Sequence, residues 1–314
     1  MSQYALPFAK LSKKSVGIAG GKGANLGEMA KAGFPIPPGF VVLSSAFDRF
    51  LEETDINVEI DAGLDRLNHQ DLTSVDRFSH EVRDLIDDAP FPEDLQKEFL
   101  SAFDRLKARY VAVRSSATAE DSQVASWAGE LETYLFIDRP KLLKTIKTCW
   151  SSLFTPRAIF YRFEKKLHKT KVSVGVVVQK MINSEKSGVC FTAHPVTKDK
   201  NQMVIEAGLG LGEAIVSGMI TPDTYVVDNE DKTILDINVA HQEKMIVQKK
   251  GAGTKVIAVK KSDQDKQVLN GKQIIELAEL CQRIEKHYHR PQDIEWALEK
   301  NKFYITQTRP ITTL

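Results

Sequence analysis

The sequence predicts a mixed α+β protein, and three observations support this fold class. The chain has 314 residues, which corresponds to about two domains or to one domain in two lobes. Long stretches carry apolar residues at helical spacing, most clearly residues 45–109 and 272–288. Other stretches are short, rich in β-branched residues and free of Pro, as in 172–181, and these predict strands. A chain of this length can bury a sizeable core.

Composition and charge exclude several classes of protein. Hydrophobic residues make up 42% and charged residues 27%, close to an ordinary globular protein. Lys and Arg number 43 and Asp and Glu 42, so the net charge of +1 argues against a dedicated nucleic-acid binder. No apolar run approaches the ~20 residues that span a bilayer, and the N-terminus lacks a secretory signal pattern. We therefore expect neither nucleic acid nor membrane as a partner, and a cytoplasmic location.

The three cysteines predict no metal site and no disulfide framework. Cys149, Cys190 and Cys281 are odd in number and lack CxxC spacing. We expect them to be small core residues in a reducing compartment.

In the first half of the chain, the expected helices and strands are bounded by proline, by glycine and by changes in the spacing of apolar residues. Pro156 is expected to break a helical stretch because proline cannot continue a helix. The expected elements are a rigid turn at 35–39, a strand at 40–43, amphipathic helices with loops over 45–109, a strand at 110–113 and a helix over 142–163.

The second half is richer in strands. Its clearest helix, 272–288, carries one apolar stripe, with Gly271 just before it and Pro291 just after it. The expected strands are 172–181, 188–192, 203–205, 224–227, 255–259, 293–298 and 303–308.

The last two strands are predicted to form a hairpin around a short polar turn. Alternation of side chains places Asp293 and Glu295 on one face, and hairpin pairing brings Glu295 opposite Gln307, within a residue of register. Gln307 and Arg309 share a face. Two acids, an amide and a guanidinium in one patch suit a divalent cation that bridges anionic oxygens, with Arg309 holding the rest of the anion.

A glycine-rich segment near the N-terminus has two interpretations. Gly20–Gly27 lets backbone N–H groups approach an anion, and Lys22 supplies a positive charge. The segment is not a Walker A motif, because Val16 and Gly23 stand where that motif needs Gly and Ser or Thr. A flexible turn that caps a helix over 24–31 explains the glycines equally well.

Three further segments are ambiguous when each is taken alone. Arg114, at the expected strand end, suits either a functional side chain or a surface ion pair. Residues 126–129, Ser-Trp-Ala-Gly, followed by Thr133, suit either a small-residue lid over a ligand or a plain β-turn. The glycines of 208–212 do not form a dinucleotide fingerprint, because the third is misplaced and no suitable acid follows.

Taken together, five segments carry a resemblance to one family, and they occur in its order and at fitting distances. These are Gly20–Gly27, Val113-Arg-Ser-Ser-Ala-Thr-Ala-Glu-Asp121, Ala125-Ser-Trp-Ala-Gly129, Gly208–Gly212 and Asp293-Ile-Glu295…Gln307-Thr-Arg309-Pro310. Essentially the whole chain resembles the nucleotide-binding part of phosphoenolpyruvate synthase, pyruvate phosphate dikinase and rifampin phosphotransferase. The local sequences of residues 149–154, 291–296 and 309–314 most resemble those of rifampin phosphotransferase.

The resemblance implies an ATP-grasp fold, in which an N-terminal lobe (1–178) and a C-terminal lobe (179–314) close on ATP and Mg²⁺. It also implies a role for each matching residue. By the resemblance, the phosphates of ATP are held by Lys22, Arg114 and Arg309, which are also the catalytic candidates. Gly129 and Thr133 lie in a lid, and Gln179 lies beside adenine. The Mg²⁺ ion is bound by Glu295 and Gln307, with Asp293 as a second acid.

The implied reaction releases AMP and passes a pyrophosphoryl group to a histidine, for final transfer to pyruvate or to an antibiotic such as rifampin. None of the seven histidines has the Gly-Gly-x-x-x-His-like setting of the family's carrier, and the sequence stops at Leu314, where the family's proteins continue. We therefore expect a carrier histidine on a separate domain or chain. The alternative is a stand-alone nucleotide sensor without phosphotransfer; the complete charged set favours the enzyme.

Overall fold

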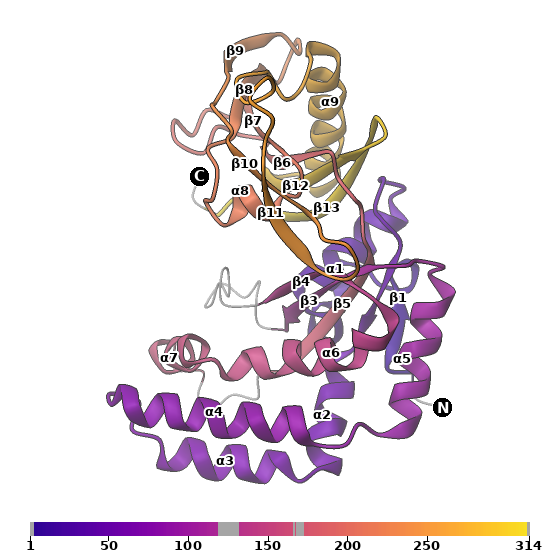
Figure 1. Cartoon of the computed structure of the whole chain (residues 1–314), viewed down its shortest axis with the longest axis vertical. Helices are drawn as coiled ribbons and strands as arrows, with labels where there is room; N and C mark the ends of the chain where they lie inside the picture. The colour runs from indigo at the N-terminus through magenta and orange to yellow at the C-terminus, as the bar shows by residue number, and fades with distance from the viewer. Residues whose placement is uncertain (1–2, 119–131, 166, 168–172, 313–314) are drawn as a thin grey trace. The chain divides into compact units, whose positions relative to one another are not determined.

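The computed structural model describes residues 3–118, 132–165, 167 and 173–312 (Figure 1). Contacts divide the chain into two compact units. Unit 1 is Met1–Lys31 with Pro38–Met181, and unit 2 is Ala32–Pro37 with Ile182–Leu314. Each unit combines helices with an antiparallel sheet, so the predicted α+β class is confirmed.

Unit 1 is built on a five-stranded sheet in which every neighbouring pair is antiparallel. The strand order across this sheet is β1 (Ala5–Pro7), β2 (Gly39–Val42), β5 (Val174–Lys180), β3 (Val111–Ala117) and β4 (Thr133–Ile137).

Helices cover one face of this sheet and enclose the main core of unit 1. Val174, Val176 and Val178 of β5 point into that core, where Phe47 and Trp150 are also buried. The helices of this layer are α2 (Ser44–Glu53), α3 (Ile56–Arg66), α4 (Leu72–Asp88), α5 (Glu93–Arg105), α6 (Leu142–Ser151) and α7 (Pro156–Glu164). The predicted helices over 45–109 and the break near Pro156 are confirmed.

The opposite face of the same sheet carries the N-terminal helix α1 (Val16–Lys31). A Cβ added to Gly175 of β5 would lie 2.9 Å from the backbone oxygen of Ala19. Because side chains alternate along a strand, Gly175, Val177 and Gln179 belong to this α1 face, while the valines between them belong to the core.

Unit 2 holds a six-stranded antiparallel sheet with one long helix, α9 (Gly271–Tyr288), packed on it. Ile274, Leu277, Cys281 and Ile284 of α9 are fully buried. The strand order is β13 (Lys302–Pro310), β12 (Gln292–Glu299), β6 (Lys186–Phe191), β7 (Gln202–Leu209), β8 (Asp223–Asp228) and β9 (Ile234–Asn238). A short helix α8 (Glu213–Val216) and a separate hairpin of β10 (Lys244–Gln248) and β11 (Thr254–Ala258) complete the unit.

Helix α9 begins one residue earlier than expected. The Asn270 side chain accepts a hydrogen bond from the backbone N–H of Gln273 at 2.9 Å, and the Gln273 side chain accepts one from the N–H of Asn270 at 3.3 Å. This reciprocal cap makes Gly271 the first helical residue rather than a residue before the helix. The helix ends where His289 adopts a left-handed conformation, with φ of 55°.

No helix in the described part of the chain is long and apolar enough to cross a membrane. Cys149, Cys190 and Cys281 are all buried and none forms a disulfide, as expected of small core residues.

Candidate functional site

The glycine-rich segment lies within a helix that is kinked at Gly20, so the flexible turn before a helix, one of its two interpretations, is not formed. Helix α1 runs from Val16 to Lys31, and only Gly20, with φ of 68° and ψ of 171°, leaves helical geometry inside it. This conformation is open almost exclusively to glycine. A Cβ on Gly20 would also lie 2.1 Å from the backbone oxygen of Ser116, so the kink brings α1 into backbone contact with β3.

Further glycines allow the same close approach. The N–H of Gly23 donates a hydrogen bond to the Ser116 hydroxyl at 3.2 Å, and a Cβ on Gly23 would lie 2.9 Å from Val41. Packing against the sheet therefore accounts for Gly20 and Gly23. Lys22, half-buried between them, is held on the α1 face of unit 1.

Arg114 lies within a strand rather than at its end. The expected strand 110–113 continues as β3 through Ala117, because residues 114–117 pair with β5. The polar side chains there have local partners: the Ser115 hydroxyl donates to the backbone oxygen of Glu132 at 3.1 Å. Arg114 is only 8% exposed.

Three of the nucleotide-binding candidates in unit 1 share one face of the sheet. Arg114 is paired with Thr133 of β4 and with Val177 of β5, and Gln179 is paired with Ala112. Paired residues of an antiparallel sheet share a face, and so do residues two apart. Arg114, Thr133 and Gln179 thus lie on the face that α1 covers, together with Lys22 on α1 itself. Gly129 lies outside the described residues.

The candidates of unit 2 lie on the C-terminal hairpin in the predicted register. Asp293 pairs with Arg309 and Glu295 pairs with Gln307 across β12 and β13, which confirms the predicted pairing. Arg309 Nε donates a hydrogen bond to Asp293 Oδ2 at 2.7 Å. A bulge follows Glu295, where the register shifts by one residue. All four side chains therefore lie on one face of the hairpin.

Glu206, at the edge of this group, was missed because the predicted strand 203–205 ends one residue before it and four residues before the end of β7. In the structure β7 extends to Leu209, and Glu206 pairs with Val189, which pairs in turn with Glu295. Burial, and then the charge of Asp293, raise the pKa of Glu206. Burial also raises the pKa of Asp293, and Glu295 adds to this, while Arg309 opposes it.

The repulsion between carboxylates that lie this close together is reduced when a cation binds between them. Within the described residues no group of three His, Cys, Asp or Glu side chains is arranged to hold a metal ion alone. Mg²⁺ is instead commonly held by one or two carboxylates together with waters and substrate phosphates. The oxygens of Glu295, Asp293 and the Gln307 amide fit that mode of binding.

The glycines of 208–212 lie where the end of β7 packs against the β10–β11 hairpin. Gly210 has φ of 80°, and a Cβ there would lie 2.4 Å from the backbone oxygen of Ile246. The N–H of Leu211 donates to the same oxygen at 2.9 Å, and the N–H of Leu209 donates to Gln242 Oε1 at 3.1 Å.

A buried carboxylate near this contact is hydrogen-bonded to several segments of unit 2 and holds them together. Asp223 accepts hydrogen bonds from the Tyr225 hydroxyl and the Val268 N–H, both at 2.7 Å, and from the Ala240 N–H and Gln242 Nε2 at 3.1 and 3.2 Å. Charged groups are costly to bury unless they are hydrogen-bonded in this way.

A match to a known family covers almost the whole chain. Residues 16–314 match the family described as "Pyruvate phosphate dikinase, AMP/ATP-binding domain". The chain belongs to this family. The stretch holds every candidate residue of both units.

Curated relatives support the same membership. A probable phosphoenolpyruvate synthase of Methanocaldococcus jannaschii is 46% identical over 97% of this chain and 26% of its own length. One of Archaeoglobus fulgidus is 46% identical over 98% of this chain and 41% of its own. The rifampicin phosphotransferase of Bacillus subtilis is 38% identical over 100% of this chain and 36% of its own. The chain thus spans about a quarter to two fifths of these relatives.

Solved structures add little to this assignment. A D-alanine–D-alanine ligase from Helicobacter pylori aligns with 69% of this chain and 47% of its own, at 12% identity and a TM-score of 0.30. A TM-score this low supports no conclusion about the fold or the function of this chain.

Proposed function

We propose that the chain is the ATP-binding catalytic domain of a dikinase-type phosphotransferase, which cleaves ATP to AMP and passes a pyrophosphoryl group to a histidine on another domain or chain. The observation that carries the proposal is the register of the C-terminal hairpin. Asp293 opposite Arg309 and Glu295 opposite Gln307 form a compact set for a cation and a phosphate, in a chain of an AMP/ATP-binding family.

Each candidate residue has a separate role in this proposal. The positive groups of Lys22, Arg114 and Arg309 contact phosphate oxygens and stabilise the negative charge that spreads over them in the transition state. Glu295 and Gln307, with Asp293, hold Mg²⁺, which bridges phosphate oxygens and neutralises part of their charge. Gln179 binds adenine, and Gly129 and Thr133 belong to a lid over the phosphates.

The final acceptor and the setting of the reaction are part of the proposal. The names of the relatives point to pyruvate or to an antibiotic such as rifampin, and the second acceptor would give a role in antibiotic resistance. The partner is a phosphohistidine carrier domain or protein. We place the reaction in the cytoplasm, which three buried cysteines without disulfides support.

The test is to incubate the chain with Mg·ATP and a carrier domain of a relative and to measure AMP and phosphohistidine. We expect both products in the wild type and a loss of about a hundredfold in rate in Lys22→Ala and in Arg114→Lys, which keeps the charge but not the fork of donors. Lys31→Ala, an exposed lysine at the end of the same helix, is the matched control.

Melting temperatures are measured in parallel, so that a folding defect is not mistaken for a lost contact. A normal AMP rate in both Lys22→Ala and Arg114→Lys would refute the assignment of these residues. Binding of Mg·ATP without AMP, with an active carrier present, would support the nucleotide sensor instead.

A further inference from the structure

The β10–β11 hairpin of unit 2 concentrates positive charge. Residues 244–261 contain six lysines and no acidic residue, and all six lysines are exposed. Within the described residues none of the six forms an ion pair. We call this segment the lysine hairpin; its lysines are Lys244, Lys249, Lys250, Lys255, Lys260 and Lys261.

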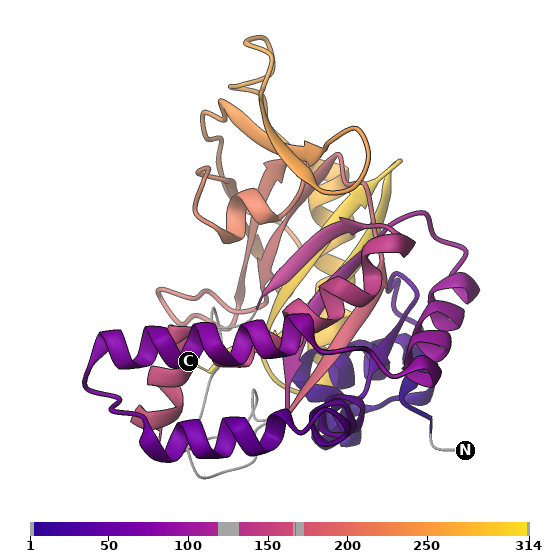
Figure 2. The ribbon, with the colours of Figure 1, turned by 60° about the horizontal axis from the view of Figure 1, so that its bottom comes forward.

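The lysine hairpin is a separate two-stranded sheet that is anchored at its base. Figure 2 shows it, in orange, standing apart from the other strands of unit 2. Its strand β10 is fixed through Ile246, whose backbone oxygen accepts the hydrogen bond from Leu211. Gln242, just before it, donates to the buried Asp223 at 3.2 Å. Anchoring holds the like charges close together, and this arrangement favours an anionic partner.

The composition of the lysine hairpin narrows the chemistry of that partner. It contains no Arg and no aromatic residue, the residue types that stack on bases, and it lacks the aromatic residues that anchor a segment in a membrane surface. It does carry exposed apolar surface, with Val256 49% exposed. Lysines around an exposed aliphatic side chain suit an acidic protein surface with apolar contacts at its centre.

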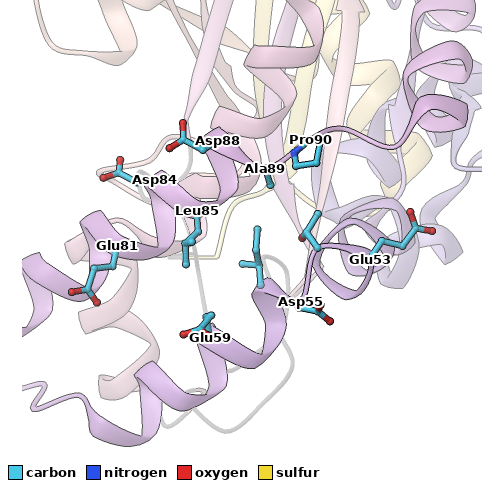
Figure 3. Close-up of a pocket in the computed structure, with 11 residues that line it drawn as sticks. Glu53, Asp55, Glu59, Glu81, Asp84, Leu85, Asp88, Ala89 and Pro90 are labelled. Atoms are coloured by element: carbon cyan, nitrogen blue, oxygen red, sulfur yellow. The ribbon is translucent and has the colours of Figure 1, made fainter.

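A surface of this kind exists on unit 1. A cavity of about 780 Å³ lies between α3 and α4, and Figure 3 shows Leu85 of α4 pointing across it toward α3. Leu85 is 40% exposed. We call this cavity the acidic groove; its carboxylates are Glu53, Asp55, Glu59, Glu81, Asp84 and Asp88.

Negative charge in the acidic groove is largely uncompensated. Arg49 pairs with Glu53 at 2.6 Å. Lys147, which donates to the backbone oxygen of Ala89 at 3.0 Å, lies near enough to Asp88 to interact with its charge. Within the described residues, the remaining four carboxylates form no ion pair. Neighbouring like charges that face solvent repel each other unless a cation lies between them. The acidic groove and the lysine hairpin are therefore complementary in charge, and each has an exposed aliphatic side chain.

We propose that the lysine hairpin of one copy of this chain docks in the acidic groove of a second copy. A hairpin tip in a cavity of this size buries less than the ~1,200 Å² of a stable interface, so the contact is weak and transient. It is also heterologous, because different surfaces meet, and it therefore builds either closed rings, of which a reciprocal pair is the smallest, or open chains of copies. The contact requires neither ATP nor phosphotransfer.

The test is sedimentation velocity without nucleotide, at low and at high salt. Variant A carries Lys249→Glu and Lys250→Glu at the exposed turn, and variant B carries Asp84→Lys and Asp88→Lys in the acidic groove. Lys198→Glu with Lys200→Glu, two exposed lysines of unit 2, is a control with the same change of net charge as variant A.

We expect the wild type and the control to self-associate at low salt, and added salt to weaken association about tenfold or more. Variants A and B should each associate about tenfold or more weakly than the wild type, because two charge reversals reduce the net charge of the lysine hairpin from +6 to +2 and that of the acidic groove from −6 to −2. An equimolar mixture of A and B should associate again, because the unchanged lysine hairpin of B meets the unchanged acidic groove of A.

Three results would overturn the proposal: a monomeric wild type at low salt, association of variant A or B at the wild-type level, or a mixture of A and B that stays monomeric. Binding of single-stranded DNA that is lost in variant A, without self-association of the wild type, would assign the lysine hairpin to nucleic acid instead. Circular dichroism of both variants shows whether they fold.

Discussion

Replacing Gly20 by alanine tests whether α1 is held on the sheet as described. The change meets two obstacles. Gly20 has φ of 68° and ψ of 171°, a conformation that costs another residue about 1–3 kcal/mol. Its new Cβ would also lie 2.1 Å from the backbone oxygen of Ser116, in a buried strand that cannot give way as a flexible side chain does, and forced overpacking costs about 1–3 kcal/mol. Together we expect a loss of about 4 kcal/mol.

Gly17→Ala is the matched control on the same helix. Nothing lies within 4 Å of a Cβ at Gly17, and its φ is not in the left-handed region. Alanine there should stabilise the helix by about 0.5–1 kcal/mol, because it is a better helix former than glycine. The two variants thus differ in sign although the chemical change is identical.

Thermal and urea unfolding measure the effect, with hydrogen exchange of the β3 amides assigning the transition to unit 1. For a unit of this size 1 kcal/mol corresponds to about 2–4 °C, so Gly20→Ala should lower Tm by about 8–16 °C. A Tm of Gly20→Ala that equals the Tm of Gly17→Ala, or that of the wild type, would refute the kink and its contact with Ser116.

Two further predictions concern acids of unit 2, the buried Asp223 and the half-buried Glu285. Asp223→Ala should lower the free energy of unfolding by about 3 kcal/mol, because it leaves buried donors without an acceptor; urea unfolding measures this, and a loss below about 1 kcal/mol would contradict the role of the network. Burial raises the pKa of Glu285, so the folded state binds its proton more tightly than the unfolded state. Stability then declines as pH rises between the unfolded and folded pKa values, and Glu285→Gln should be more stable than the wild type at pH 7 but equal to it below about pH 4. A difference that does not depend on pH would show that the charge of Glu285 is not the cause.

Local patterns predicted the C-terminal hairpin well. Strands 293–298 and 303–308 are joined by a short turn, so alternation and hairpin geometry alone fix which side chains face each other. The pairing of Glu295 with Gln307 follows from positions close together in the chain. Helix α9 was predicted for the same reason, since its apolar stripe and its ends are local features.

Features that depend on distant residues were not predicted. The conformation of Gly20 is set by Ser116, far along the chain, and the glycines alone fit a flexible turn equally well. Strand β3 continues through Arg114 because β5 pairs with it, which the polar residues Ser115 and Ser116 conceal. Strand β9 was missed because most of its side chains are exposed and its pattern resembles a loop.

The family was recognisable although its motifs are individually weak. Order and spacing of five segments carry the information, and the match over residues 16–314 agrees with them. The candidates fall into two groups, four on the C-terminal hairpin of unit 2 and four on the α1 face of unit 1.

Paramagnetic broadening by Mn·ATP tests most directly whether both units serve one nucleotide. Mn²⁺ takes oxygen ligands as Mg²⁺ does and broadens amide resonances near it. In isotope-labelled protein with substoichiometric Mn·ATP, we predict simultaneous loss of signal around Gly20–Gly27 in unit 1 and along β12 and β13 in unit 2, reversed by excess Mg·ATP. Broadening confined to one unit, or spread evenly over the surface, would contradict a shared nucleotide site.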